Sequence, residues 1–144
     1  MKIAKLLGST AVLGMVELGA TTLPAYAGSP HFVDDSATAT NNHNGTVTVS
    51  GKEAGLGNET QIHVNVTATA LCINGGGNHP KAVNKQSVSA GADVPVQNGK
   101  ADYSVLLGPA VFTPSCSPPM TVGWSNIVIT DTTNNISTKV SGTF

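Results

Sequence analysis

Hydrophobic and polar residues alternate along most of the chain after residue 45. The clearest run is "TQIHVNVTATALC" over 60–72, in which the even positions from Ile62 to Cys72 are apolar or small and the odd positions from His63 to Thr69 are polar. Side chains of a β-strand point to opposite faces with a period of two. The run therefore predicts a long strand with one buried face.

Shorter runs with the same period predict further strands, separated by turn sequences such as Asn44-Gly45 and Asn98-Gly99. In one of them, "TVGWSNIVIT", strict alternation would place Val122, Trp124 and Val128 on one face. No stretch keeps a period of 3.6 residues. The predicted strands after residue 45 are 46–50, 60–72, 85–90, 101–107, 121–130 and 135–140.

This pattern predicts an all-β fold, an Ig-like antiparallel β-sandwich of about seven strands with one disulfide. A true immunoglobulin sequence has a tryptophan between its two cysteines, whereas Trp124 follows the second cysteine here. We expect the sandwich to span 46–144. Residues 28–45 are small and polar, which predicts a flexible lead-in with at most a short edge strand around Phe32 and Val33.

The first 27 residues have the layout of a signal peptide. Lys2 and Lys5 precede a mainly apolar stretch, and "AYA" at 25–27 has small residues where a signal peptidase cleaves. A retained anchor would need about 20 uninterrupted apolar residues, but Glu17 interrupts this stretch. We therefore expect a secreted, extracellular protein that does not insert into the membrane after signal removal.

The charges are few and nearly balanced. Seven lysines and no arginine stand against eight acidic residues, for a formal net charge of −1. Nucleic-acid binding needs a basic surface, usually with arginine, and anionic lipid attracts polybasic clusters. The composition excludes nucleic acid as a partner.

Cys72 and Cys116 are the only cysteines, and both lie in the part expected to be exported. An even number of cysteines in an oxidising compartment predicts a disulfide. The alternative is a pair of metal ligands, but neither a CxxC nor an HxxxH spacing accompanies them.

The glycine-rich segment "CINGGGNHPK" contains the candidate ligand-binding residues Asn74, Asn78 and His79. The alternative is a hairpin loop in which these side chains are solvated. Zinc takes three or four nitrogen, sulfur or carboxylate ligands, more than this segment offers. We predict no metal site and no cofactor, and leave open a calcium ion bound by loops from different strands, with candidates at Asp34-Asp35, 41–44 and 131–135.

Catalytic motifs are not apparent. The chain has no G-x-S-x-G sequence, and its carboxylates show no spacing that would pair them across a cleft. We therefore expect a protein that is not an enzyme.

A second candidate site is the proline-rich stretch "VFTPSCSPPMTV". A disulfide at Cys116 would make a preorganised recognition loop of Ser117, Pro118, Pro119 and Met120, and preorganisation lowers the cost of binding. Protease inhibitors present such loops, so a protease inhibitor using 114–120 is one interpretation. The other is a rigid connection between two sheets.

The stretches "LCINGGGNHPKAVNK", "VPVQNGKADYSV" and "PSCSPPMTV" resemble a group of small exported proteins of Gram-positive bacteria. The resemblance covers roughly 45–132 and implies export and a disulfide-bonded β domain, but no activity. The resulting hypothesis is a secreted, non-catalytic protein that acts by surface interaction or as a structural component of the cell exterior. Its partner would be an unknown extracellular protein or a component of the cell wall.

Overall fold

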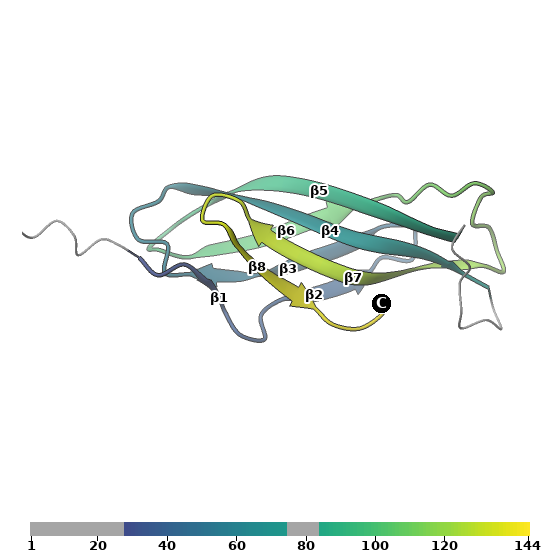
Figure 1. Cartoon of the computed structure of the whole chain (residues 1–144), viewed down its shortest axis with the longest axis horizontal. Coiled ribbons are helices and arrows are strands. Elements are labelled where there is room, and N and C mark those ends of the chain that lie inside the picture. Colours follow the sequence, from purple (N-terminus) through teal and green to yellow (C-terminus); the bar gives the residue numbers. More distant parts are fainter. Residues whose placement is uncertain (1–27, 75–83) are drawn as a thin grey trace, which may run out of the picture.

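The computed structural model describes residues 28–74 and 84–144, which form eight strands in two antiparallel sheets (Figure 1). These strands confirm the predicted all-β sandwich, with one strand more than expected. No helix long and apolar enough to cross a membrane is found in this described part. The predicted signal peptide, 1–27, lies outside it.

In the first sheet, β3 lies at the centre and pairs with the three other strands. The second sheet has the order β5-β4-β7-β8, so β5 and β8 form its edges. The first sheet contains β1 (His31–Phe32), β2 (Thr38–Asn41), β3 (Val47–Ala54) and β6 (Ala101–Leu107), and the second contains β4 (Gln61–Ile73), β5 (Lys85–Pro95), β7 (Thr121–Asp131) and β8 (Ile136–Val140).

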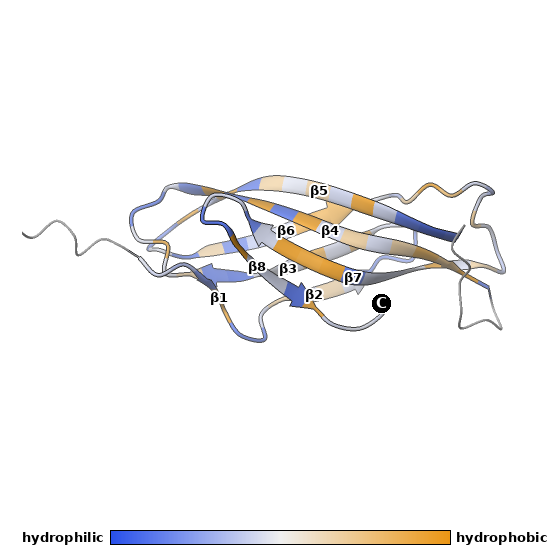
Figure 2. Cartoon of the chain, viewed as in Figure 1, coloured by the Kyte–Doolittle hydropathy of each residue, from blue (hydrophilic) through white to orange (hydrophobic). Residues whose placement is uncertain are grey.

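The core lies between the two sheets, and β4 supplies one side of it as the alternation predicts. Its even-numbered residues from Ile62 to Cys72 are buried, and His63 is exposed. Figure 2 shows hydrophobic residues along the strands of both sheets. Each fully buried large aliphatic side chain contributes about 1.5–3 kcal/mol, so burial of this kind dominates the stability of the sandwich. The first sheet supplies Val47, Val49, Tyr103, Val105 and Leu107 to the same core.

β7 departs from strict alternation, and the expected position of Val128 is wrong. Trp124 is buried, but Ile127 and Ile129, not Val128, follow it into the core. The β4–β7 register shifts at this point, and Asn126 has a φ of 52°. The irregularity inserts an extra residue, so the inward positions change from even to odd numbers.

The N-terminal part of the described chain belongs to the first sheet. β1 and β2 both pair with β3, and Phe32 packs edge-on against Tyr103 with ring centroids 6.1 Å apart. The lead-in predicted for 28–45, with at most a short edge strand around Phe32 and Val33, therefore contains β1 near that position and a second strand, β2.

The strands run along the long axis of the molecule, so the connections gather at two ends (Figure 1). We call the end formed by 42–46 and 108–120 the loop end. The opposite end, formed by 55–60, 96–100 and 132–135, is called the turn end.

Candidate functional site at the loop end

A disulfide anchors the loop end. Cys72, at the end of β4, is bonded to Cys116, and the two residues are 44 positions apart with a Cα–Cα distance of 5.7 Å. This bond confirms the predicted pairing and ties the connection between β6 and β7 to the second sheet. By restricting the unfolded chain, closure of such a loop stabilises the fold by roughly 4 kcal/mol. A disulfide of this kind fits an oxidising extracellular environment.

The predicted recognition loop is an exposed turn next to this disulfide. The Met120 N–H donates a hydrogen bond to the Ser117 carbonyl at 2.8 Å, which closes the turn, and the side chains of Ser117, Pro118 and Pro119 are exposed. Met120 is half-buried, with its Sδ atom 3.7 Å from the Cys72 Sγ atom. The turn is therefore held at its base, while its tip faces solvent.

The segment that leaves β6 carries an exposed hydrophobic side chain. The Ala110 N–H donates to the Gly45 carbonyl at 3.0 Å, and the Val111 N–H donates to the Gln86 side-chain oxygen at 2.9 Å. Phe112 is buried in the core, whereas Val111 remains 70% exposed. The backbone contacts and the anchor at Phe112 thus hold Val111 outward.

The polar sequence "NNHNG" builds the turn between β2 and β3. The Asn41 side-chain amide donates to the Val122 carbonyl at 2.9 Å, and the Asn44 side-chain oxygen accepts the Thr46 N–H at 3.1 Å. Asn42 donates to the Thr46 hydroxyl at 2.9 Å. These amides, considered as calcium ligands in the sequence, stabilise the turn and link it to β7.

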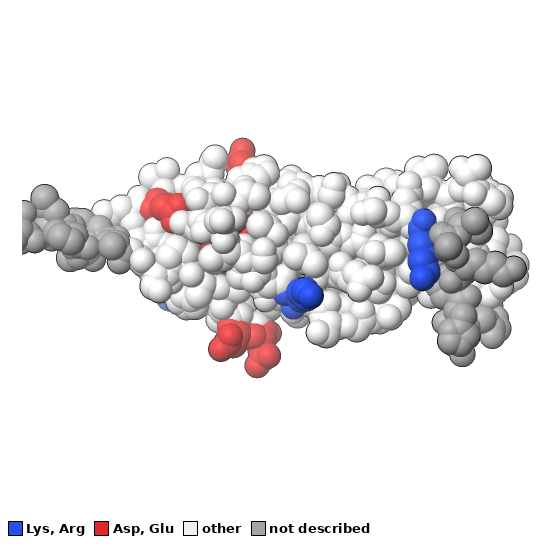
Figure 3. Space-filling view, viewed as in Figure 1, with Lys and Arg blue, Asp and Glu red and all other residues white. Residues whose placement is uncertain are grey.

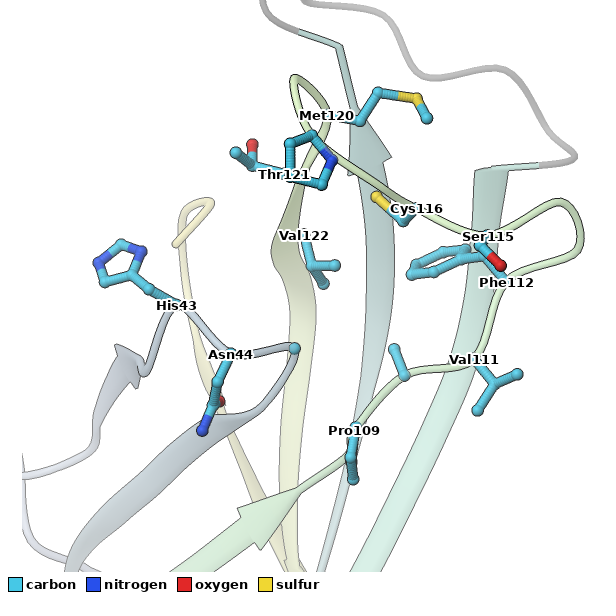
Figure 4. Close-up of a pocket in the computed structure, with 13 residues that line it drawn as sticks. His43, Asn44, Pro109, Val111, Phe112, Ser115, Cys116, Met120, Thr121 and Val122 are labelled. Carbon is cyan, nitrogen blue, oxygen red and sulfur yellow. The ribbon is translucent and has the colours of Figure 1, made fainter.

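A hollow of about 510 Å³ lies among these segments (Figure 4). His43 and Asn44 lie on one side of it, and Val111 lies on the other, in the connection that follows β6. Its apolar lining includes prolines, an aromatic ring, aliphatic side chains and sulfur atoms, and none of the lining residues that the structure describes is acidic or a lysine. The remaining lining residues include Pro109, Phe112, Ser115, Cys116, Pro118, Met120 and Thr121.

Acidic residues are concentrated away from the loop end. The stretches 60–92 and 103–130, which include the connection that carries the disulfide, contain neither aspartate nor glutamate. On the face shown in Figure 3, acidic side chains lie only in the half of the molecule nearer the turn end. Lys85, at the start of β5, lies at this end, but the described lining of the hollow carries neither lysine nor acid. The hollow can therefore bind through hydrogen bonds and apolar contact, with little electrostatic attraction.

Only part of the glycine-rich candidate site is described. Asn74 is exposed just after β4, whereas Asn78 and His79 lie outside the described residues, and this site stays a prediction. Within 28–74 and 84–144, no three His, Cys, Asp or Glu side chains come together in a way that could hold a metal ion. The described histidine nearest in sequence, His63, bonds through Nδ1 to Asp93 at 2.7 Å.

The structure also contains a pair of buried carboxyl groups that sequence reasoning missed. Glu53 of β3 and Asp131 of β7 are both 0% exposed. Asp131 accepts hydrogen bonds from the Thr133 and Asn134 backbone N–H groups, at 2.8 and 3.1 Å, and from the Asn134 side-chain amide. It therefore closes the turn between β7 and β8.

Glu53 lacks comparable support. Neither of its side-chain oxygens has a formed hydrogen bond, although Asp131 is close enough to influence it. The pKa of Glu53 is raised to about 8. Burial is the main cause; the nearby Asp131 carboxyl, through hydrogen bonding and charge, and the charge of Glu59 raise it further. Burial, with a smaller effect from Glu53, also raises the pKa of Tyr103 to about 12. Extending the alternation of "TVTVS" through Gly51 would have placed Glu53 on the buried face.

Comparison of the chain with models of protein families, with curated proteins and with solved structures finds no match.

Proposed function

We propose that this protein is a secreted, non-catalytic β-sandwich with Ig-like architecture, which acts outside the cell by surface contact through its loop end. The observation that carries this proposal is the exposure of Val111 beside a hollow whose walls are held in place. A disulfide, a buried phenylalanine and two hydrogen bonds position the segment that presents it. Rigid apolar surface of this kind lowers the ordering cost of binding.

The chemistry of the loop end indicates a neutral partner. An apolar group could occupy the hollow, while the side chains of His43, Asn44 and Ser115 offer hydrogen bonds at its margin. The partner is then an extracellular protein or a cell-wall component that presents an uncharged surface. Because the described lining residues include no acid or lysine, electrostatic steering contributes little to the encounter.

The buried carboxyl pair supports a structural role more than a catalytic one. Glu53 and Asp131 are enclosed between the sheets, and Asp131 already accepts hydrogen bonds from the turn that follows it. A general acid or base must come within hydrogen-bonding distance of its substrate. Full enclosure of both carboxyl groups therefore favours a role in stability.

The test compares the retention of two variants on the isolated cell envelope of the producing organism. Val111→Asp places a charge on the exposed wall of the hollow, and Leu106→Asp makes the same change at a 57% exposed position on β6, as a matched control. We expect Val111→Asp to weaken retention at least tenfold and Leu106→Asp to behave like the wild type. Equal retention of all three proteins, or no retention of the wild type, would contradict the proposal.

A further inference from the structure

The free edge of β5 differs from the other sheet edges. β5 is an eleven-residue edge strand, and from Gln86 to Ala92 it has no charge, no proline and no register shift against β4. β1, β2 and β8 have only two, four and five residues, and β6 carries Asp102. Natural proteins usually protect long edges with charges, prolines or bulges, so an unprotected edge of this length favours pairing with another strand.

The backbone groups that point away from β4 can be identified from one hydrogen bond. The Val96 N–H donates to the Thr60 carbonyl at 3.0 Å, and the register then continues unbroken from Gln61–Pro95 to Leu71–Lys85. Hydrogen-bonded pairs alternate along an antiparallel ladder. The even-numbered residues of β5 therefore bond to β4, and the odd-numbered ones direct their N–H and C=O groups to the free edge. Pro95, which has no N–H, is odd-numbered, in agreement with this assignment.

We infer that the free edge of β5 pairs antiparallel with β5 of a second copy, with Ser89 on the two-fold axis. In this register Lys85 of one copy lies opposite Asp93 of the second copy, and this pair occurs twice. Both side chains are exposed, on the outer face of the sheet. In a two-fold interface, each contact between two different residues forms twice, once in each direction. The Lys85–Asp93 pair therefore favours this register at both ends of the contact.

The residues between the charges suit close pairing. Ser87, Ser89 and Gly91 are the outward positions, and all are small. An added Cβ atom at Gly91 would lie 2.8 Å from the His63 Nε2 atom, so the imidazole ring already covers this position within the chain. A register shifted by two residues places Lys85 opposite Pro95 and loses both charge pairs. The resulting dimer has one continuous sheet of eight strands.

Charge reversal tests the inferred register on the full, disulfide-bonded protein, with the mass in solution measured by light scattering over a range of concentrations. We expect a dimer for the wild type, weaker dimerisation for Lys85→Asp and for Asp93→Lys, and recovery in the double variant, where the opposite charges are exchanged. Ser89→Lys places two like charges on the two-fold axis and should abolish the dimer. Its control is Thr67→Lys, because Thr67 is the exposed neighbour of Ser89 on β4.

Engineered cysteines provide a second readout that does not depend on charge. Two copies of Ser89→Cys lie opposite one another and should form an intermolecular disulfide. Two copies of Ser87→Cys are displaced by four residues, roughly 13 Å along the strand, which is too far for a disulfide. A monomeric wild type would overturn the inference. So would equal effects of Ser89→Lys and Thr67→Lys on dimerisation, or equal cross-linking of Ser89→Cys and Ser87→Cys. Val111→Asp should leave the dimer intact, which separates this interface from the proposed binding surface.

Discussion

Glu53 should make the stability of the protein fall as the pH rises. Its pKa is about 8 in the folded protein, against 4.5 as its ordinary value. Between these values the folded protein keeps a proton that the unfolded chain has released, so the free energy of unfolding decreases with increasing pH. The contribution is fully present below pH 4.5 and is lost as the pH rises through 8. At roughly 1.4 kcal/mol for each pKa unit, the loss between pH 5 and 8 is about 4 kcal/mol.

The variant Glu53→Gln isolates this effect, because the amide has nearly the shape of the protonated acid and does not ionise. Urea unfolding at pH 5, 6, 7, 8 and 9 should show the wild type losing stability relative to Glu53→Gln as the pH rises. The matched control is Glu59→Gln, which removes a nearby carboxylate but leaves Glu53 to titrate, so most of the decline should persist. Parallel stability curves for the wild type and Glu53→Gln would show that Glu53 does not have a raised pKa in the folded protein.

Three further predictions concern the disulfide, β7 and the binding surface. Replacing both Cys72 and Cys116 with serine should lower the free energy of unfolding by roughly 4 kcal/mol, measured in urea, and an unchanged midpoint would contradict the proposed anchoring. Ile129→Ala should lower the free energy of unfolding by about 2–5 kcal/mol because Ile129 is fully buried, and Val128→Ala, on the half-exposed face, should lower it clearly less. The reverse order in thermal unfolding would indicate that Val128, and not Ile129, faces the core. Retention on the cell envelope should change less than threefold between 50 and 500 mM salt, because the described lining of the hollow has no acidic residue or lysine, and a steep decline would indicate a charged partner.

The fold could be predicted from the sequence where one simple periodicity continued for many residues. β4 alternates from Gln61 to Ala70, and its buried face was predicted residue by residue, although Leu71 is also buried near its end. β7 could not be predicted as fully, because one residue with a positive φ, Asn126, reverses the faces that follow it. β1 was anticipated only as a possible short edge strand near Phe32, and the short, polar β2 was not predicted; both strands pair with β3. That contact lies outside the local pattern.

The candidate site was predictable only in its separate parts. Two cysteines predicted the disulfide, and prolines around Cys116 pointed to the exposed turn. The hollow combines segments that are distant in the sequence, so no local motif could indicate it. Glu53 was missed because the alternation in β3 continues through a glycine, where it is hard to recognise.

Photo-crosslinking on the cell surface tests most directly whether the loop end is the binding surface. A photoreactive amino acid is placed either at Val111, on the wall of the hollow, or at Gln97, an exposed position at the turn end, as the control. We expect a discrete adduct with an envelope protein or cell-wall fragment from position 111, lost on addition of excess unlabelled protein, and none from position 97. Adducts from position 97 alone, or the same adducts from both positions, would contradict this expectation.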